Sequence, residues 1–484
     1  MPPPSEETPL LQNGEQHAKS FVHRVVDVCK AEGEPGWAHS LRYFFFTSWL
    51  NIVLIFVPLS ALAHFLHWDV ALRFSFSFIA IIPLAKLLGD ATEQMSLSLG
   101  QTLAGLLNAT FGNAVEIIVG ITALLQDQIR IVQTSMLGSI LSNLLLVLGM
   151  SFLAGGIVKK ESSFRVTAAQ TNASLMTLAC ITLVIPAAYH SARGLGTIPS
   201  LFAPSPVIPK TPVEPDIISA TSLVTDNGTV IDIDEEGQRG LLIISRGTAL
   251  LLLGVYVAYL VFQLKTHFAL FQAKKKVLLK TEQESDDEEA LLSPPLTATT
   301  PGVSRANAGL PSEIQQEEEE EETAEMSVIS ASVMLLAVTI VTSFVADYLV
   351  ASIEEFAERY HIPKPFIGLI LLPIVANAAE HVTSVWMAMK DKMELTIGVC
   401  VGSSIQLATF VIPFLVVVGW ISGHELTLFF DNFETVAFFV SVLLVNLLIQ
   451  DGKSNYMEGV MLMTLYLVIA LACASSHHLG VCTL

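Results

Sequence analysis

The most informative stretch of this sequence is Gly112-Asn113-Ala114-Val115-Glu116, which places an amide and a carboxylate in a largely apolar run from Leu103 to Leu125. An ionised carboxylate near the centre of a lipid bilayer costs about 2.5–3.5 kcal/mol on insertion scales, so such a residue needs a partner or a function. The pattern recurs as Ala376-Asn377-Ala378-Ala379-Glu380, inside the apolar run from Phe366 to Met389. The sequence therefore predicts two carboxylates in similar positions within membrane-spanning segments.

The two stretches are related by a constant offset along the chain. Glu380 follows Glu116 by 380 − 116 = 264 positions, and Gly402-Ser403 follows Gly138-Ser139 by 402 − 138 = 264 positions. Two matches at one offset indicate an internal duplication, as in membrane transporters that are built from structural repeats.

The composition is that of a membrane protein. Of the 484 residues, 52% are hydrophobic and only 14% are charged, and the mean hydropathy is +0.60. These values exclude an ordinary soluble globular domain and make the lipid bilayer a partner of the chain. Much of the formal net charge of −20 lies in two short stretches, 282–289 and 317–325. The charge is therefore a local feature of one loop, and no nucleic-acid partner is expected.

Taking about 20 apolar residues as one membrane span, we predict an all-α polytopic membrane protein. One extra N-terminal helix precedes two inverted repeats of five helices each. The eleven predicted helices cover residues 41–66, 70–89, 100–125, 130–157, 165–190, 241–264, 326–350, 363–389, 394–420, 432–450 and 455–475.

The chain divides accordingly into tails, repeats and a linker. The predicted parts are a cytosolic N-terminal tail (1–40), the extra transmembrane helix (41–66), the first repeat (67–264) with a lumenal loop (191–240), a cytosolic acidic linker (265–325), the second repeat (326–475) and a lumenal C-terminal tail (476–484). The N-terminal tail contains an acidic dileucine pattern, Glu6-Glu7-Thr8-Pro9-Leu10-Leu11, which resembles sorting signals for vacuoles and lysosomes. The same short pattern is also common in plain disordered tails.

The distribution of lysine and arginine favours a cytosolic N-terminus. The cytosolic ends would then contain most of these residues, among them Lys159, Lys160 and Lys274-Lys275-Lys276. The glycosylation sequon Asn227-Gly228-Thr229 would lie in the lumenal loop. Helices three and eight, which contain the two acids, would run in opposite directions, so the acids can meet near the middle of the membrane.

Further polar residues accompany the two carboxylates. The candidate site consists of side chains that bear oxygen atoms: Glu116, Glu380, Asn113, Asn377, Ser139, Ser403, Asn143 and Gln406. Each asparagine of the two repeated stretches precedes its glutamate by three residues, so a continuous helix would place both on one face. No Cys or His lies at a spacing typical of a zinc or copper site. Oxygen ligands suit Ca²⁺, which takes six to eight of them at about 2.3–2.6 Å.

This ligand set predicts exchange of ions at a single site. Two facing carboxylates neutralise one divalent cation; without the cation they repel each other, so at least one of them takes up a proton readily. We therefore expect a site that holds either Ca²⁺ or protons, and no cofactor. Gly112, Gly138, Gly402 and Pro373 would permit close helix approach and local helix breaks.

Several features have alternative interpretations. His381, next to Glu380, fits a proton-pathway or pH-sensing group as well as a packed polar residue. The acidic segment Glu317-Glu318-Glu319-Glu320-Glu321-Glu322 fits a regulatory or ion-attracting element as well as a solvated linker. The serine, asparagine and glutamine side chains of the site also fit simple interhelical hydrogen bonding.

At these motifs the chain resembles the cation/proton exchanger family, in particular fungal vacuolar Ca²⁺/H⁺ exchangers of the Ca²⁺/cation antiporter superfamily. The resemblance covers about residues 41–475, and one departure is Ala376, where the family usually has glycine. The matching stretches are Asn108-Ala109-Thr110-Phe111-Gly112-Asn113-Ala114-Val115-Glu116-Ile117-Ile118, Gly138-Ser139-Ile140-Leu141-Ser142-Asn143, Asn377-Ala378-Ala379-Glu380-His381 and Gly402-Ser403-Ser404-Ile405-Gln406.

The resemblance implies a function and a location. It implies antiport of cytosolic Ca²⁺, with Mn²⁺ as a second candidate ion, into an acidic vacuole in exchange for protons. Glu116 and Glu380 would be the shared ligands, and the chain would be a multi-pass protein of the vacuolar membrane. A homo-oligomer is compatible with these features.

Three other functions compete with this one. A Na⁺-coupled Ca²⁺ exchanger would share the duplicated carboxylates, and a passive cation channel would also line a pore with paired acids. An intramembrane enzyme is the least favoured, because the sequence has no catalytic His cluster, nucleophile elbow or metalloprotease signature.

Overall fold

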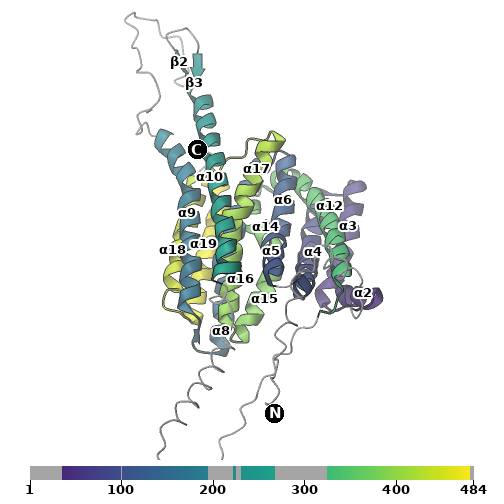
Figure 1. Cartoon of the computed structure of the whole chain (residues 1–484). Helices are drawn as coiled ribbons and strands as arrows, with labels where there is room; N and C mark the ends of the chain where they lie inside the picture. The colour runs from purple at the N-terminus through teal and green to yellow at the C-terminus, as the bar shows by residue number, and fades with distance from the viewer. Residues whose placement is uncertain (1–34, 100, 195–221, 225–229, 268–323, 480–484) are drawn as a thin grey trace, which may run out of the picture.

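The structure, a computed structural model, describes residues 35–99, 101–194, 222–224, 230–267 and 324–479, and it is a bundle of long helices (Figure 1). Within these residues, seven helices are long and apolar enough to cross a membrane, and two bent helix pairs and two shorter apolar helices accompany them. Together these segments correspond to the eleven predicted spans. Helices suit the lipid bilayer because each helix satisfies its backbone hydrogen bonds internally.

The first part of the bundle extends from α2 to η3. Here η1 is a 3₁₀ helix, whereas η2 and η3 are π-helical. The elements are α2 (Trp37–Phe46), η1 (Trp49–Ile55), α3 (Phe56–Phe65), α4 (Val70–Leu99), α5 (Gln101–Phe111), α6 (Ala114–Leu125), α7 (Ile129–Leu141), η2 (Ser142–Val147), α8 (Leu148–Val158), α9 (Val166–Gly194), α10 (Ile233–Val261) and η3 (Phe262–Thr266).

The second part of the bundle extends from α12 to α19, with η5 and η6 as π-helical segments. The elements are α12 (Val328–Tyr360), α13 (Lys364–Phe366), η5 (Ile367–Leu371), α14 (Leu372–Ala376), α15 (Ala378–Met389), α16 (Met393–Gln406), η6 (Leu407–Val411), α17 (Ile412–Ser422), α18 (Asn432–Leu448) and α19 (Tyr456–Leu479).

Two small antiparallel sheets lie outside the long helices. β1 (Ser162–Ser163) pairs with β4 (Lys453–Ser454), with Ser162 opposite Ser454. β2 (Ser222–Val224) pairs with β3 (Val230–Asp232), with Leu223 opposite Ile231. The first of these sheets joins the α8–α9 connection to the α18–α19 connection at one end of the bundle.

The helix contacts come in mirrored pairs, as two inverted repeats require. α6 packs on α17 and α12, and its counterpart α15 packs on α8 and α4. α10 packs on α17, and α19 packs on α8. The equivalent helices α4 and α12 pack on each other, as do α9 and α18, and these two pairs lie on opposite sides of the bundle in Figure 1.

The interruptions of the helices also follow the repeat. The third span breaks between α5 and α6 at Gly112 and Asn113, and the eighth breaks between α14 and α15 at Asn377, with a bend of 58°. The π-helical segments η2 and η6 begin shortly after Ser139 and Ser403, respectively. π-Helical turns inside α-helices often mark functional sites, and both of these adjoin residues of the predicted site.

The structure departs from the predicted elements in several places. α4 extends to Leu99 and α12 to Tyr360, beyond the predicted ends at 89 and 350. The extra N-terminal segment is not one straight helix, because α2 meets the η1–α3 segment at 86°. α10 begins at Ile233, inside the predicted loop 191–240, so its first turns continue the helix beyond the apolar run. The boundaries of the predicted tails, linker and repeats remain predictions.

The core lies where α7, η2 and α8 pass through the bundle. Leu137, Ile140, Leu141, Leu144 and Phe152 are all fully buried. Almost every side chain in the range 131–148 is buried, so this span is surrounded by protein on all sides, whereas α19 and α10 expose much of their apolar surface. The central helices therefore contain the polar groups that lipid would not tolerate.

Candidate cation site

Both predicted acids lie in the first turn of a half-helix. Glu116 is in the first turn of α6 and Glu380 is in the first turn of α15. The free N–H groups and the dipole of a helix N-terminus favour negative charge, so each break places a carboxylate where the helix itself stabilises it. The helix breaks thus position the two acids.

The amide in front of each acid lies outside the helix. The spacing predicts that Asn113 shares a helical face with Glu116, but Asn113 directly precedes α6 with a non-helical backbone. Its side chain reaches the second repeat instead: Nδ2 donates to Oε1 of Gln406 at 2.7 Å, and its Oδ1 accepts from Oγ of Ser403 at 2.9 Å. Asn377 occupies the equivalent position before α15.

A second set of hydrogen bonds, made by Asn143 and Asn377, also joins the two repeats. Nδ2 of Asn143 donates to Oγ of Ser403 at 3.0 Å, and Nδ2 of Asn377 donates to the backbone carbonyl of Ser139 at 3.2 Å. Asn143 and Asn377 have no exposed surface at all. Each repeat therefore supplies amides that bind groups of the other.

The two acids lie within this network. The side chains of Ser403 and Asn143 lie within hydrogen-bonding reach of the Glu380 carboxyl, and Glu380 is close enough to Glu116 for their charges to interact. The structure therefore brings together all eight predicted residues: Glu116, Glu380, Asn113, Asn377, Ser139, Ser403, Asn143 and Gln406.

Several oxygen atoms of this network have no hydrogen-bond partner. In the part of the chain that the structure describes, these buried atoms include Oε2 of Glu380, Oδ1 of Asn143 and Oδ1 of Asn377. A buried polar group without a partner costs about 1–3 kcal/mol, so a cation or a proton that bound here would relieve that cost. The donor set consists of hard oxygen atoms, which fits Ca²⁺ better than a soft metal.

Carboxylates alone do not complete a coordination shell here. The described residues contain no group of three or more His, Cys, Asp or Glu side chains that could hold a metal ion. Amide, hydroxyl and backbone carbonyl oxygens would have to provide the remaining ligands, and the site contains all three kinds.

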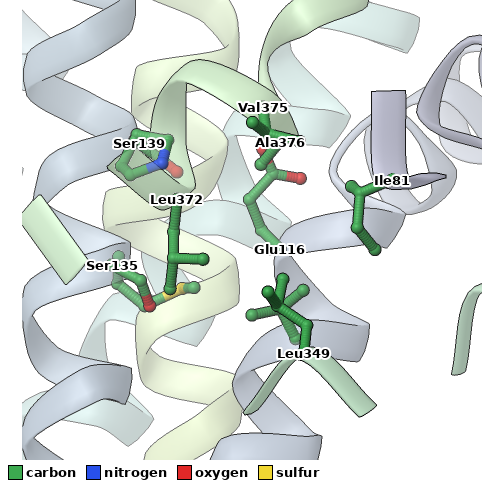
Figure 2. A pocket seen from close by; sticks show the side chains of 11 residues that line it. Ile81, Glu116, Ser135, Ser139, Leu349, Leu372, Val375 and Ala376 are labelled. Carbon is green, nitrogen blue, oxygen red and sulfur yellow. The ribbon is translucent and has the colours of Figure 1, made fainter. Parts of the chain in front are cut away.

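A cavity adjoins the Glu116 side of the site (Figure 2). The Glu116 carboxyl points towards Val375 and Ala376, where α14 ends. Ser139 and Ser135 contribute hydroxyl groups to the lining, and most of the other lining residues are apolar. Ser135 is not among the predicted site residues, although it precedes Ser139 by four residues and so lies on the same helical face.

The glycines near the site have different roles. A Cβ atom at Gly138 would lie 2.3 Å from the carbonyl oxygen of Leu369 and 2.7 Å from Pro373, so the predicted close helix approach is confirmed there. At Gly112 a Cβ atom would lie 2.5 Å from the carbonyl oxygen of Asn108. The same prediction is wrong for Gly402, where a Cβ atom would meet nothing within 4 Å.

His381 follows Glu380 in α15 and contacts the residue at the helix break. Its Nδ1 donates to the backbone carbonyl of Asn377 at 2.6 Å, and its buried Nε2 has no hydrogen-bond partner among the described residues. This bond fixes the ring beside the helix break. A proton-pathway role for His381 stays a prediction, and the acidic segment 317–322 lies outside the described residues.

Comparison with known proteins gives consistent matches over most of the chain. The profile of the sodium/calcium exchanger protein family matches residues 70–265 and 330–474. A vacuolar calcium ion transporter of Schizosaccharomyces pombe is 41% identical over 88% of this chain and 84% of its own length. Vacuolar cation/proton exchanger 3 of Oryza sativa is 36% identical, over 89% of this chain and 87% of its own.

A solved structure shares the fold. The crystal structure of a selenium-substituted Ca²⁺/H⁺ antiporter protein, YfkE, superposes with a TM-score of 0.61 at 28% sequence identity. The match covers 90% of this chain and 99% of YfkE.

Proposed function

Because this chain belongs to the sodium/calcium exchanger protein family, we propose that it is a secondary antiporter that moves cytosolic Ca²⁺ into the vacuole in exchange for protons. Its relatives are named vacuolar calcium ion transporter and vacuolar cation/proton exchanger, and a protein of the same fold is named a Ca²⁺/H⁺ antiporter. Mn²⁺ is a second candidate for transport, because it also accepts oxygen ligands.

One observation carries this proposal: buried oxygen atoms without partners lie in a network that joins the two repeats. Oε2 of Glu380, Oδ1 of Asn143 and Oδ1 of Asn377 are such atoms. A Ca²⁺ ion would draw on all of them and on both carboxylates. Protons on the carboxyl groups would remove the negative charge that attracts the cation, so the two kinds of ion exclude each other.

The site residues have distinct roles in this proposal. Glu116 and Glu380 bind Ca²⁺ or protons directly. The side chains of Asn113, Ser403 and Gln406 form one chain of hydrogen bonds that holds the break before α6 against α16. Asn377, through the carbonyl of Ser139, holds the break before α15 against α7. Rearrangement of these contacts would turn the site from one side of the membrane to the other.

The proposed orientation places the N-terminus in the cytosol. The excess of lysine and arginine at that end of the bundle supports it. The turn between α6 and α7 and the connection between α17 and α18 then face the vacuolar lumen, and the β1–β4 sheet faces the cytosol. The chain acts as a transporter, and its ions are substrates, with no cofactor and no catalytic residues.

Uptake by reconstituted vesicles tests the proposal. Vesicles with an acidic interior and no sodium should accumulate Ca²⁺, and collapse of the pH gradient with an ionophore should stop the accumulation. A requirement for sodium would indicate a Na⁺-coupled exchanger instead. Calcium flux that continues after the gradient has collapsed would indicate a channel, and either result would overturn the proposal.

A further inference from the structure

The two half-helices that begin with the acids also end in the same way. α6 is followed by Asp127 at φ 56° and α15 by Asp391 at φ 58°, and both are non-glycine residues in the left-handed region. The amide of Asp127 bonds to the carbonyl of Leu124, and the amide of Asp391 bonds to the carbonyl of Ala388. The offset is again 391 − 127 = 264, so these two turns are equivalent positions at opposite ends of the bundle.

The partners of the two aspartates differ in chemistry. Asp391 accepts from Nζ of Lys159 at 2.6 Å and from Oγ of Ser162 at 2.9 Å. Asp127 instead faces Nε2 of His424 at 3.4 Å. His424 is equivalent to Lys160, the neighbour of Lys159, since 424 − 160 = 264. The cation at one end is therefore a lysine, and at the other end it is a histidine.

This difference decides how each pair responds to pH. The Lys159 ammonium lowers the pKa of the Asp391 carboxyl, so that pair stays charged throughout the neutral range. Histidine is the side chain that gains or loses its charge between pH 5 and 8. The Asp127–His424 contact is an ion pair only while the imidazole carries a proton, a condition that the lysine pair does not have.

We propose that His424 is a lumenal positioning residue, which ties the α17–α18 connection to the α6–α7 turn when the lumen is acidic and releases it when the lumen is neutral. The proposal rests on the function above only for the assignment of this end to the acidic compartment. The backbone amide of His424 donates to the carbonyl of Gly419 at 2.9 Å, so the backbone of His424 is fixed to the end of α17. The turn that it holds leads through α6 to Glu116.

Other charges near this pair have their own partners or lie in solvent. Nδ1 of His424 lies 2.8 Å from Oγ of Ser422. The surrounding charged groups are Glu425 next to it in the chain, Arg130 with its partners Asp431 and Glu434, Arg246 over the ring of Trp420, Asp347 bound by Gln126, and Glu354 bound by Gln128 and Lys364. Among the residues that the structure describes, Asp127 is the acid within ion-pair distance of the His424 ring.

Hydrogen–deuterium exchange on the full chain in lipid nanodiscs, without calcium or a pH gradient, tests the proposal directly. After correction for the intrinsic effect of pH, backbone amides of residues 423–431 should exchange about two- to fivefold faster at pH 7.5 than at pH 5.5, as expected for loss of an exposed ion pair. His424→Lys should protect these amides at both pH values. His424→Gln should leave them fast at both.

The opposite end of the bundle provides the matched control. Lys159→His should give residues 160–163 a pH-dependent exchange rate that the wild-type protein lacks there. Equal protection of residues 423–431 in the wild-type and His424→Gln proteins at pH 5.5 would overturn the proposal. Where a variant folds poorly, Asp127→Asn provides the same comparison from the other side of the pair.

Transport separates this inference from the proposed function. At a constant pH difference across the membrane, the uptake rate of the wild-type protein should change as the lumenal pH is varied between 5.5 and 7.5. His424→Lys should remove this dependence on lumenal pH. A wild-type protein that shows the pH-dependent exchange but no Ca²⁺ uptake would refute the antiporter and leave the positioning role intact. Uptake with the same lumenal pH profile in all variants would refute the positioning role and leave the antiporter intact.

Discussion

Glu116 and Glu380 each face a buried polar network from the first turn of a half-helix. Replacement by glutamine keeps the shape of each side chain but removes its charge and its ability to bind a proton. With one carboxylate gone, part of the charge of a bound Ca²⁺ ion would have no counter-charge. Removal of one partner of a buried ion pair costs about 3–5 kcal/mol, which corresponds to more than about 100-fold in binding. We expect Glu116→Gln and Glu380→Gln each to abolish proton-driven Ca²⁺ uptake in vesicles.

Glu358→Gln is the control for these variants, because Glu358 is an exposed acid on α12. It should transport at the wild-type rate. Near-normal uptake by either site variant would show that the two acids are not shared ligands.

Ser403 connects both halves of the network, because its hydroxyl donates to Asn113 and accepts from Asn143. Ser403→Ala would leave both amides without this partner inside the protein, at a cost of about 1–3 kcal/mol. We expect its apparent affinity for Ca²⁺, measured from the concentration dependence of uptake, to fall about tenfold or more.

The adjacent residue gives a matched control. Ser404 is also buried, but its hydroxyl donates to the carbonyl of Cys400 in its own helix at 2.8 Å. Ser404→Ala should keep its affinity within about twofold. An equal loss in both variants would indicate a general packing defect rather than a contribution of the Ser403 hydroxyl.

The sequence predicted which polar residues lie together better than how they are arranged. Charged and amide side chains inside apolar runs are conspicuous because the bilayer penalises them, so Glu116 and Glu380 could be identified from the sequence. The position of Asn113 ahead of α6 depends on where the helix breaks, which helical spacing does not reveal. Ser135 was missed because a serine in a membrane helix commonly bonds its own backbone, as its hydroxyl does to Val132 at 3.2 Å.

Individual elements show how the repeats are fitted together. Gly138 of α7 lies against the backbone of η5, whereas the equivalent Gly402 of α16 has open space around it. Gly138→Ala should therefore force α7 and η5 apart and lower stability by about 1–3 kcal/mol. Thermal denaturation in detergent should show a clearly lower midpoint, and transport should slow.

Gly402→Ala tests this reasoning at the equivalent position. Both glycines lie inside helices, so alanine improves helix propensity by up to about 1 kcal/mol in each. The variant should be as stable as the wild-type protein or slightly more stable. A similar loss of stability in both variants would contradict the proposed role of the α7–η5 contact.

The sequence predicted most spans because an apolar run of sufficient length has few alternatives in a membrane protein. It did not predict the 86° bend between α2 and the η1–α3 segment, because the chain is apolar on both sides of the turn, with Phe44-Phe45-Phe46 before it and Trp49-Leu50 after it. It also placed the start of α10 too late. The residues after Ile233 include Asp234, Glu235 and Glu236, and a helix that extends beyond the bilayer can contain such residues.

At the scale of the molecule, the duplication gives both the fold and the position of the site. Mirrored contacts such as α6 with α17 and α15 with α8 bring the two helix breaks together. The inverted arrangement was predictable because the offset of 264 and the odd number of spans in each repeat follow from the sequence. The cavity next to Glu116 was not predictable, because it depends on side-chain packing that differs between the repeats.

The linker between the repeats is expected to regulate transport and not to perform it. Deletion of residues 317–322 removes six glutamates, none of which is among the predicted Ca²⁺ ligands. The variant should change the apparent Ca²⁺ affinity or the regulation of transport, while the maximal uptake rate stays within about twofold. Acidic residues outside a binding site attract cations and so mainly change the rate at which a cation reaches that site. Complete loss of turnover in a correctly inserted variant would show that the segment belongs to the transport step.

The central claim is that Ca²⁺ and protons compete for the same pair of buried acids. Calorimetric titration of the purified protein with Ca²⁺, repeated in buffers of different ionisation enthalpy, counts the protons released as the cation binds. We predict that the wild-type protein releases protons on binding and that the combined Glu116→Gln and Glu380→Gln variant neither binds nor releases them. Binding of Ca²⁺ by the wild-type protein without proton release, between pH 5.5 and 7.5, would contradict the account.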